Sequence, residues 1–493
     1  MQKTKVANKL MNLIMALTLV IMVSCKNSGA GDISDDAQMQ KETGSEEPGT
    51  EKITDNLPEI SFNGADFNIL MREEYEREFS AEYETGDVVN DAVYKRNGIV
   101  EERFGVNINP IALTGNFSQR QVFIDALRNS VLAADGAYDM VAGAANYLMA
   151  LTGDGLFLNL RNSEYINFEQ PWWSSDFAEN MAINDVLYTA TGDIAFNTLE
   201  EMILMFFNKQ LCEDYEIELP YQLVRDGKWT FDKMQEYAKM VSVDVDGNGK
   251  FDAADKYGLM LEGNPVKTIM MNMGVNFSEK GGDGLPKMTY MSEKMLDIFD
   301  KMKALLADTE HIFKHPQTGD TLQTFSDMEK VFSESRILLM SLVLSSAQSL
   351  RSMEVDFGLI PMPKYDAAQE KYRTVVLEKF TIVGIPSSAK DPKMSEIIIE
   401  ALASESAVTT IPAYYDISLK VKQSRDTESG EMLDLIRSNI IYDFAYVNNQ
   451  SLEDIGNLFN NVLSANGDLV SAYEKISDKI EQNLGKLIES YQK

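Results

Sequence analysis

Between residues 65 and 144, segments with the residue pattern of strands alternate with segments that have the residue pattern of helices. The segments "ADFNILM" (65–71), "VNINPIAL" (106–113) and "YDMVAGA" (138–144) have the aromatic and β-compatible residues of strands. Residues 87–105 and 118–134 lie between them and carry apolar side chains near helical spacing. Because strands that alternate with helices pair in parallel, this order predicts an α/β domain with a mainly parallel sheet.

The pattern continues after a mixed middle region. Further strands are expected at 187–195, 199–208, 355–363 and 379–389, and further helices at 228–243, 391–404 and 468–491. Thr230 is the expected N-cap of the first of these helices. A chain of 493 residues is too long for one ordinary core, so we expect two domains or lobes.

The N-terminus has the features of an export signal. A basic start with Lys3, Lys5 and Lys9 precedes the apolar run 10–23, which is too short to span a bilayer. The run ends at Cys25 in a sequence that resembles the bacterial lipobox. This resemblance implies a signal peptide over 1–24, a lipid on the Cys25 sulfur, and attachment to the extracellular face of the cell membrane. The alternative is a plain secretory signal with an incidental cysteine.

The segment that follows is polar. Residues 25–57 are mostly Gly, Ser, Thr, Asp and Glu, and such a segment cannot offset its ordering entropy by burial. We therefore expect a flexible linker between the lipidated cysteine and the folded body.

Composition excludes several classes of function. The net charge of −32 disfavours nucleic-acid binding. Two cysteines, Cys25 and Cys212, make a disulfide framework improbable, and two histidines leave little material for a zinc site or a histidine triad. No HExxH, GxSxG or phosphate-loop pattern occurs.

An acidic loop between the helix expected at 228–243 and a strand-like run resembles the twelve-residue calcium loop of EF-hand sensors. The candidate ligands are Asp244, Asp246, Asn248, the Lys250 carbonyl, Asp252 and Asp255, with Gly249 at the sharp turn. The last acid is Asp where sensors use Glu, and no second helix follows, so a sensor role is disfavoured. Two readings stay open: an acidic turn without metal, and one structural Ca²⁺ site.

Five longer segments occur in the order seen in one protein family. In chain order they are "YDMVAGAANYLMALTGDGLFLNL" (138–160), "MFFNKQLCEDYEIELP" (205–220), "GKWTFDKMQEYAKMVSVDVDGNGKFDAADKYGL" (227–259), "FSDMEKVFSESRILLM" (325–340) and "FGLIPMPKYD" (357–366). Together they resemble the extracellular solute-binding lipoproteins of bacterial ABC transporters, above all the large, family 1-like group of sugar-binding proteins. The resemblance covers most of residues 60–420.

The resemblance implies a two-lobed α/β clamshell of the periplasmic-binding-protein type, with lobes linked by a hinge. We expect lobe 1 at 58–165 plus 350–406, and a lobe 2 with a mostly helical periphery at 166–349 plus 407–493. The implied function is capture of an extracellular solute by a monomer and its delivery to the permease subunits of an ABC importer. A mono- or oligosaccharide is the expected solute, and a peptide or a polyol is the alternative.

A sugar site combines aromatic platforms with polar groups that bind hydroxyls. Most candidates lie just past or before predicted strands, where α/β sheets leave crevices. They are Arg72, Glu73, Asn146, Tyr147, Asp193, Asn197, Glu378 with Lys379 beside it, and the cluster Tyr414, Tyr415 and Asp416. Trp172 and Trp173 are the expected stacking platform, against the alternative that one of them faces the core.

Two other classes of function stay open. A secreted carbohydrate-active enzyme needs a pair of carboxylates, which a chain with 77 acidic residues always offers. An adhesion lipoprotein would use the acidic loop, stiffened by calcium, at a protein–protein surface. We expect a binding protein without enzymatic activity and without an organic cofactor.

Overall fold

A computed structural model describes residues 54–252, 254–262, 265–313, 325–415 and 427–492. They belong to one compact unit that begins at Thr54. The predicted signal peptide, Cys25, most of the linker and Asp416 lie outside the described residues. Among the helices that are described, none is long and apolar enough to cross a membrane.

The first sheet has four strands in the order β12-β3-β1-β2. Its strands are β1 (Ala65–Arg72), β2 (Val106–Leu113), β3 (Met140–Ala144) and β12 (Thr381–Gly384). β1 pairs in parallel with β2 and β3, and β12 runs antiparallel to β3. The parallel arrangement of the first three strands confirms the prediction from the sequence.

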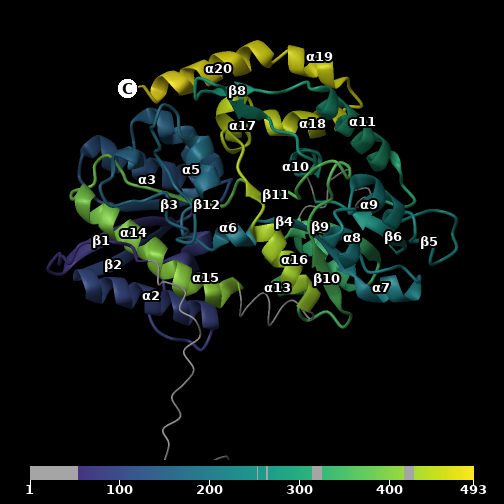
Figure 1. The fold of residues 1–493 in the computed structure, drawn as a ribbon, viewed down its shortest axis with the longest axis horizontal. Coiled ribbons are helices and arrows are strands. Elements are labelled where there is room, and N and C mark those ends of the chain that lie inside the picture. The colour runs from purple at the N-terminus through teal and green to yellow at the C-terminus, as the bar shows by residue number, and fades with distance from the viewer. Residues whose placement is uncertain (1–53, 253, 263–264, 314–324, 416–426, 493) are drawn as a thin grey trace, which may run out of the picture. The chain divides into compact units, whose positions relative to one another are not determined.

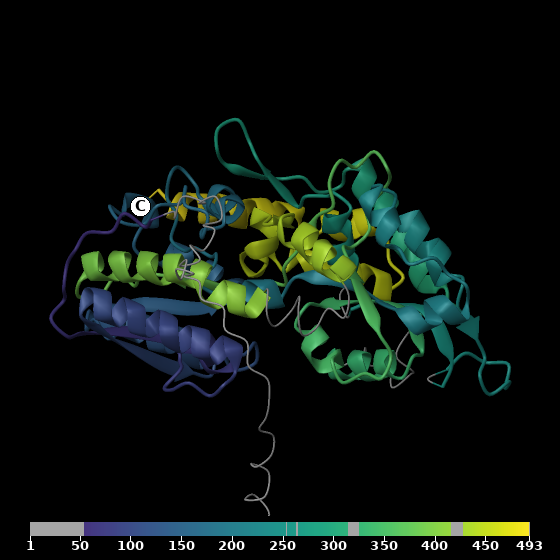
Figure 2. The same cartoon turned by 60° about the horizontal axis from the view of Figure 1, so that its bottom comes forward.

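Helices cover both faces of this sheet (Figures 1 and 2). α2 (Val88–Phe104) and α14 (Pro392–Val408) lie on one face, and α3 (Arg120–Ala133) and α5 (Ser175–Met181) lie on the other. Alternate residues of β1 enter two different cores: Ile69 packs with the α14 side, and Leu70 packs with the α3 side. This alternation follows from the period of two along a strand.

Local signals set the bounds of these helices. The Asp87 carboxylate accepts hydrogen bonds from the Val89 and Asn90 amides at the start of α2. The same helix ends at Gly105, whose φ of 59° lies in the left-handed region that glycine adopts without strain. Asp391 caps α14 in the same way as Asp87 caps α2, immediately before a proline at the first helical position.

The second sheet has five strands in the order β10-β4-β9-β6-β5. They are β4 (Ile203–Asn208), β5 (Ser242–Val243), β6 (Lys256–Met260), β9 (Ile337–Val343) and β10 (Phe357–Ile360). Every residue of β4, β9 and β10 is buried. β10 pairs with β4, so the segment from 350 to 360 belongs with the second sheet and not with lobe 1, where the sequence analysis placed it.

The remaining elements of the second lobe are mainly helices. They are α7 (Lys209–Asp214), α8 (Tyr221–Arg225), α9 (Phe231–Ala238), α10 (Pro265–Asn272), α11 (Glu293–Ala307), α12 (Phe325–Ser333), α13 (Ser346–Leu350), α16 (Thr427–Arg437), α17 (Phe444–Val447) and α18 (Ile455–Ser464), with the hairpin β7 (Ser278–Lys280) and β8 (Pro286–Met288). The Thr230 hydroxyl caps α9, as predicted.

Two chain segments that pass between the sheets run antiparallel to each other. Isolated bridges pair Ala190 with Val383 and Met202 with Val376. The first segment contains the short helix α6 (Asn197–Glu200), and it is irregular where a strand was expected at 187–195. The second runs from β11 (Thr374–Val375) to β12. The α/β fold is therefore two-lobed, as predicted.

The C-terminal helices lie along the top of Figure 1, and the chain ends above the helices of the first lobe. The helix expected at 468–491 is divided into α19 (Leu469–Glu474) and α20 (Ser477–Ser490). The Tyr491 hydroxyl donates to Thr152 Oγ1 at 3.0 Å, and its ring lies 4.9 Å from that of Tyr188. The end of the chain thus packs on the first lobe, although residues 407–493 were expected in the second.

Candidate ligand-binding pocket

A pocket of about 390 Å³ lies where β1, β2 and β3 end. We call it the strand-end pocket, and its volume falls within the range of small-molecule sites. Its lining residues are Arg72, Glu74, Tyr75, Gly115, Asn116, Phe117, Ala144, Asn146, Tyr147, Leu377, Glu378 and Lys379. The carboxyl ends of parallel strands meet at one edge of a sheet, which is why residues far apart in sequence converge here.

Four of the predicted ligand residues line this pocket together. Arg72 is the last residue of β1, and Asn146 and Tyr147 lie in α4 (Ala145–Leu148), which directly follows β3. Glu378 comes from the second crossing segment, just before β12, with Lys379 beside it. The sheet edge and the crossing segment therefore build the pocket jointly.

Three polar atoms of these side chains are buried without a hydrogen-bond partner in the described part of the chain. They are Arg72 Nε, Asn146 Oδ1 and the Tyr147 hydroxyl. A buried polar group without a partner is costly, so a cluster of them in a pocket indicates a missing partner. Burial raises the pKa of Tyr147 to about 12, so its hydroxyl stays protonated at neutral pH and can donate as well as accept.

The carboxylates of the pocket are already engaged by the protein. Glu378 Oε1 lies 2.6 Å from the Lys267 ammonium, and the Tyr446 hydroxyl lies 3.0 Å from Glu378 Oε2. Burial acts to raise the pKa of Glu378, but the Lys267 charge outweighs it and holds this pKa below its usual value. Glu74 accepts the backbone amides of Gly115 and Asn116, at 3.3 and 2.8 Å.

Arg72 also connects the pocket to the crossing segments. Its Nη2 donates to Thr381 Oγ1 at 2.9 Å, and Thr381 Oγ1 lies 2.6 Å from Glu78 Oε2. The other Glu78 oxygen accepts the Asn197 amide at 2.8 Å. Burial raises the pKa of Glu78 to about 7. Asn197 is fully buried in this network and does not line the pocket.

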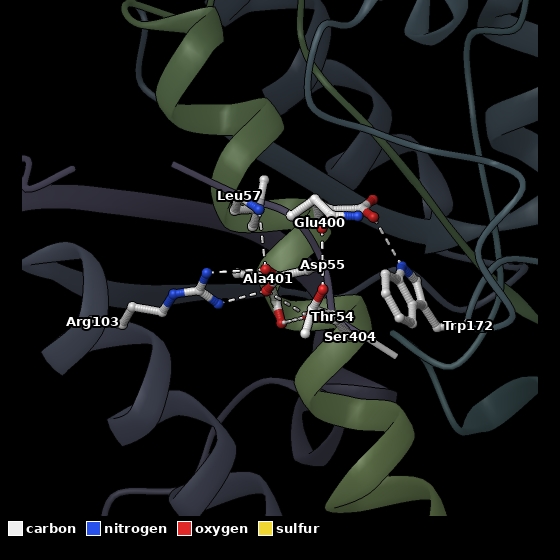
Figure 3. Close-up of polar contacts among 9 residues, drawn as sticks. Thr54, Asp55, Leu57, Arg103, Trp172, Glu400, Ala401 and Ser404 are labelled. Carbon is white, nitrogen blue, oxygen red and sulfur yellow. Dashed lines mark hydrogen bonds and ion pairs between the residues drawn. The ribbon is translucent and has the colours of Figure 1, made fainter. Parts of the chain in front are cut away.

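The two tryptophans do not form the expected open platform. Trp172 and Trp173 are 3% and 4% exposed, and their indole N–H groups donate to Glu400 Oε1 and Oε2 at 3.0 and 2.7 Å. Figure 3 shows Trp172 directed at Glu400 on α14. A tandem of indoles can satisfy both oxygens of one buried carboxylate, and this bonding competes with display of the rings at a surface.

Asp193 lies with the tryptophans around a second cavity, of about 400 Å³, apart from the strand-end pocket. Its carboxylate is 3.2 Å from Arg437 Nη2. Burial raises the pKa of Asp193 to about 6, against the effect of the arginine.

The remaining predicted residues lie elsewhere. Glu73 is exposed at the start of the 3₁₀ segment Glu73–Glu78. Tyr414 and Tyr415 are buried: Tyr414 stacks on Phe196 at 5.1 Å, and the Tyr415 hydroxyl donates to Asp434 at 3.2 Å.

Sequence reasoning missed part of the pocket wall. Glu74, Tyr75, Gly115, Asn116 and Phe117 all line it. The last three follow β2 directly, so the rule that selected residues just past a strand applies to them equally.

The acidic loop lies between β5 and β6, so a strand follows it, as expected. Carboxylate oxygens of Asp244, Asp246 and Asp255 lie within 4.8 Å of one another. Asn248 Oδ1 accepts the Lys250 amide, and Asp252 Oδ1 accepts the Ala254 amide. Three of the candidate ligands thus converge, and they too accept loop amides: Asp244 from Gly249, Asp246 from Asn248, and Asp255 from Val245.

No family model and no curated protein sequence matches the chain. Solved structures do match it. A cyclo/maltodextrin-binding protein complexed with maltotetraose has 12% identity and a TM-score of 0.56, covering 87% of this chain and 97% of its own. An ABC substrate-binding protein of Listeria monocytogenes, in complex with cycloalternan, has 12% identity and a TM-score of 0.54, covering 86% and 99%.

A third match is an ABC transporter solute-binding protein of Thermotoga lettingae, bound with α-D-tagatose. It has 14% identity and a TM-score of 0.53, and the match covers 85% of this chain and 100% of that protein. At such identities the likeness is one of fold. The chain therefore has the two-lobed α/β fold of the substrate-binding proteins of ABC transporters.

Proposed function

We propose that this protein is the substrate-binding component of an ABC importer and that it captures a carbohydrate in the strand-end pocket. The three partnerless atoms carry this proposal: Arg72 Nε is a donor, Asn146 Oδ1 is an acceptor, and the Tyr147 hydroxyl is both. A sugar hydroxyl donates and accepts at once, so neighbouring hydroxyls match such a mixed set. The similar proteins described above, whose structures hold saccharides, support the same solute class.

Binding without catalysis is the role that the pocket charges favour. A glycosidase needs one carboxylic acid of raised pKa to protonate the leaving group and a second carboxylate as base or nucleophile. The pKa of Glu378 is held down by Lys267, and Glu74 is bound to two backbone amides. Glu378 is therefore unsuited to the role of the protonated acid, and Glu74 already accepts two amides of the protein.

We also propose that the captured solute is passed to a membrane permease and that Cys25 carries a lipid anchor. The signal-like N-terminus supports export, and a protein that serves a permease from outside the cell gains from attachment to the membrane. Metabolic labelling with a radioactive fatty acid tests the anchor. Wild type should be labelled, and Cys25→Ala should not.

The acidic loop is a proposed structural site for one Ca²⁺. A hard cation prefers oxygen ligands, and the converging carboxylates of Asp244, Asp246 and Asp255 offer them. Asn248, Lys250 and Asp252 are the further candidates from the sequence. Such an ion would offset the repulsion among the acids and brace the second lobe, far along the chain from the strand-end pocket residues.

A thermal-shift screen of the folded body tests the carbohydrate proposal. The panel is maltotriose, cycloalternan, tagatose, sorbitol and a tripeptide, each with product analysis by chromatography. At least one saccharide should raise Tm without being consumed, and Arg72→Gln should lose the shift. A response to the tripeptide or sorbitol alone would move the assignment to another solute, and consumption of a saccharide would indicate an enzyme. No response to any compound would favour an adhesion role.

A further inference from the structure

The loop of residues 114–119, between β2 and α3, is held in a fixed shape at the pocket rim. From outside the loop, Glu74 accepts the Gly115 and Asn116 amides. Within the loop, Asn116 Oδ1 accepts the Gln119 amide at 3.1 Å, and Asn116 Nδ2 donates to Gln119 Oε1 at 2.8 Å. A loop with this many anchors presents its remaining side chains in a defined position.

Phe117 is the large apolar side chain that this loop presents. It lines the strand-end pocket and is 63% exposed. The Arg120 guanidinium covers one face of the ring, with Cζ 4.2 Å from the ring centroid. The exposed area therefore belongs to the opposite face and the edges. An aromatic ring held open in this way beside unsatisfied polar atoms is suited to an amphipathic ligand.

Gly115 is needed for the space it leaves. It is buried, and a Cβ at this position would lie 2.7 Å from Arg72 Cγ and 3.0 Å from the Tyr147 hydroxyl. Its φ is outside the left-handed region, so the backbone itself accepts other residues. Any side chain here would displace Arg72 and Tyr147, two of the three pocket residues that carry partnerless polar atoms.

We propose that the loop 114–119 determines which saccharide the protein binds, with Phe117 as the platform on which the apolar C–H face of a pyranose ring stacks. This inference rests on the proposed function. Arg72, Asn146 and Tyr147, which carry the partnerless atoms, line the same pocket as Phe117 and would receive the hydroxyls of a ring stacked there. Because Gly115 has no side chain, the space between the Phe117 ring and the polar atoms stays open. The substituents of the sugar ring must fit into this space, so they decide which saccharide binds.

Titration calorimetry with maltotriose, cycloalternan and tagatose tests the platform. Phe117→Ala should weaken binding of the saccharide that wild type binds best by about tenfold or more, and Phe117→Trp should restore it and report binding by its fluorescence. Tyr83→Ala is the matched control, because Tyr83 is an aromatic residue of the same lobe that is 66% exposed and does not line the pocket.

Gly115→Ala tests the need for this open space. It should lower affinity by a similar factor in a protein that still unfolds in one cooperative transition, while Gly98→Ala, at an exposed position of α2 where a Cβ meets no atom within 4 Å, should leave affinity unchanged and raise Tm slightly through the higher helix propensity of alanine. Wild-type binding with unchanged affinity in Phe117→Ala and Gly115→Ala would overturn the role of the loop but leave the proposed function standing. Absence of wild-type binding to all three saccharides would overturn both.

Discussion

The Lys267 ammonium lies 2.6 Å from Glu378 Oε1, and this ion pair joins α10 of the second lobe to the segment that enters β12 of the first sheet. The side chains are only 8% and 14% exposed. Because Glu378 lines the strand-end pocket, the pair couples the packing of the two lobes to the wall of the candidate site.

Removal of the cation from this pair should be strongly destabilising. Lys267→Met leaves the buried Glu378 charge without its cation, with the Tyr446 hydroxyl still donating to it, and the expected loss is about 3–5 kcal/mol of the free energy of unfolding. The double variant Lys267→Met with Glu378→Met removes both charges and should recover much of that loss. Urea denaturation measures all the terms of this double-mutant cycle. Additive losses in the double variant would show that the ion pair contributes nothing by itself.

The Glu400 carboxylate should make stability depend on pH in a defined window. Burial raises the pKa of Glu400 from 4.5 to about 7, despite the two indole donors. The folded protein therefore keeps a proton that the unfolded chain releases between these values. This contribution is fully present below pH 4.5 and is lost as pH rises through 7. The glutamine of Glu400→Gln does not titrate. The free energy of unfolding of this variant, relative to that of wild type, should therefore rise between pH 4.5 and 7, by about 3 kcal/mol at most.

Tryptophan fluorescence gives an independent measurement of the same group. Titration of Glu400 should change the emission of Trp172 and Trp173 with a midpoint near pH 7. Trp229 donates to the Pro361 carbonyl, which does not titrate, and serves as the internal reference. A transition that persists in Glu400→Gln would assign it to another group.

The first described residues are fastened to the first lobe by Asp55, as Figure 3 shows. Its carboxylate accepts two hydrogen bonds from Arg103, at 2.5 and 2.9 Å, and one from Ser404 on α14 at 3.2 Å. Burial acts to raise the pKa of Asp55, but Arg103 and the other donors hold it below its usual value.

Asp55→Asn should therefore cost about 1–3 kcal/mol of unfolding free energy at pH 7. The difference from wild type should vanish as pH falls through the lowered pKa, because protonation removes the charge from the wild-type residue as well. Asp154→Asn is the control: its partner Arg128 and Asp154 itself are 40% and 44% exposed, so the expected change is about 0–1 kcal/mol. Equal losses in the two variants, measured by urea denaturation, would contradict this account.

Much of the fold was predictable because its signals are local. The strand at 106–113 matches β2, and the helices expected at 87–105 and 391–404 match α2 and α14 within a few residues. The two helices begin at an aspartate cap, Asp87 and Asp391, and α2 ends at Gly105. The prediction of one helix over 468–491 was wrong in one respect, because the chain forms two helices with a break after Lys475. The apolar residues keep helical spacing across this break, so the sequence pattern does not show it.

The candidate site was predictable only where position along a strand decides it. Arg72, Asn146 and Tyr147 follow strands of a parallel sheet, so topology alone brings them to one edge. The burial of Trp172 and Trp173 depends on Glu400, more than 220 positions away in the sequence. Lobe membership of β10 and α20 likewise depends on long-range pairing and packing, which no local pattern encodes.

The acidic loop should bind Ca²⁺ and stabilise the second lobe if the proposed ion site is correct. Ca²⁺ at one hundred times its dissociation constant would add about 2.7 kcal/mol to the free energy of unfolding, whereas Mg²⁺ demands a stricter geometry and should add less. Asp246→Asn is the informative variant, because Asp246 is exposed whereas Asp255 is buried, and an asparagine Oδ1 can still accept the Asn248 amide that Asp246 accepts. Asp283→Asn, in the turn of the β7–β8 hairpin, is the matched control.

Thermal unfolding in Ca²⁺ and in EDTA should show a Tm difference in wild type and Asp283→Asn that is lost in Asp246→Asn. Equal Tm values in Ca²⁺ and EDTA for wild type would make the loop an acidic turn without metal.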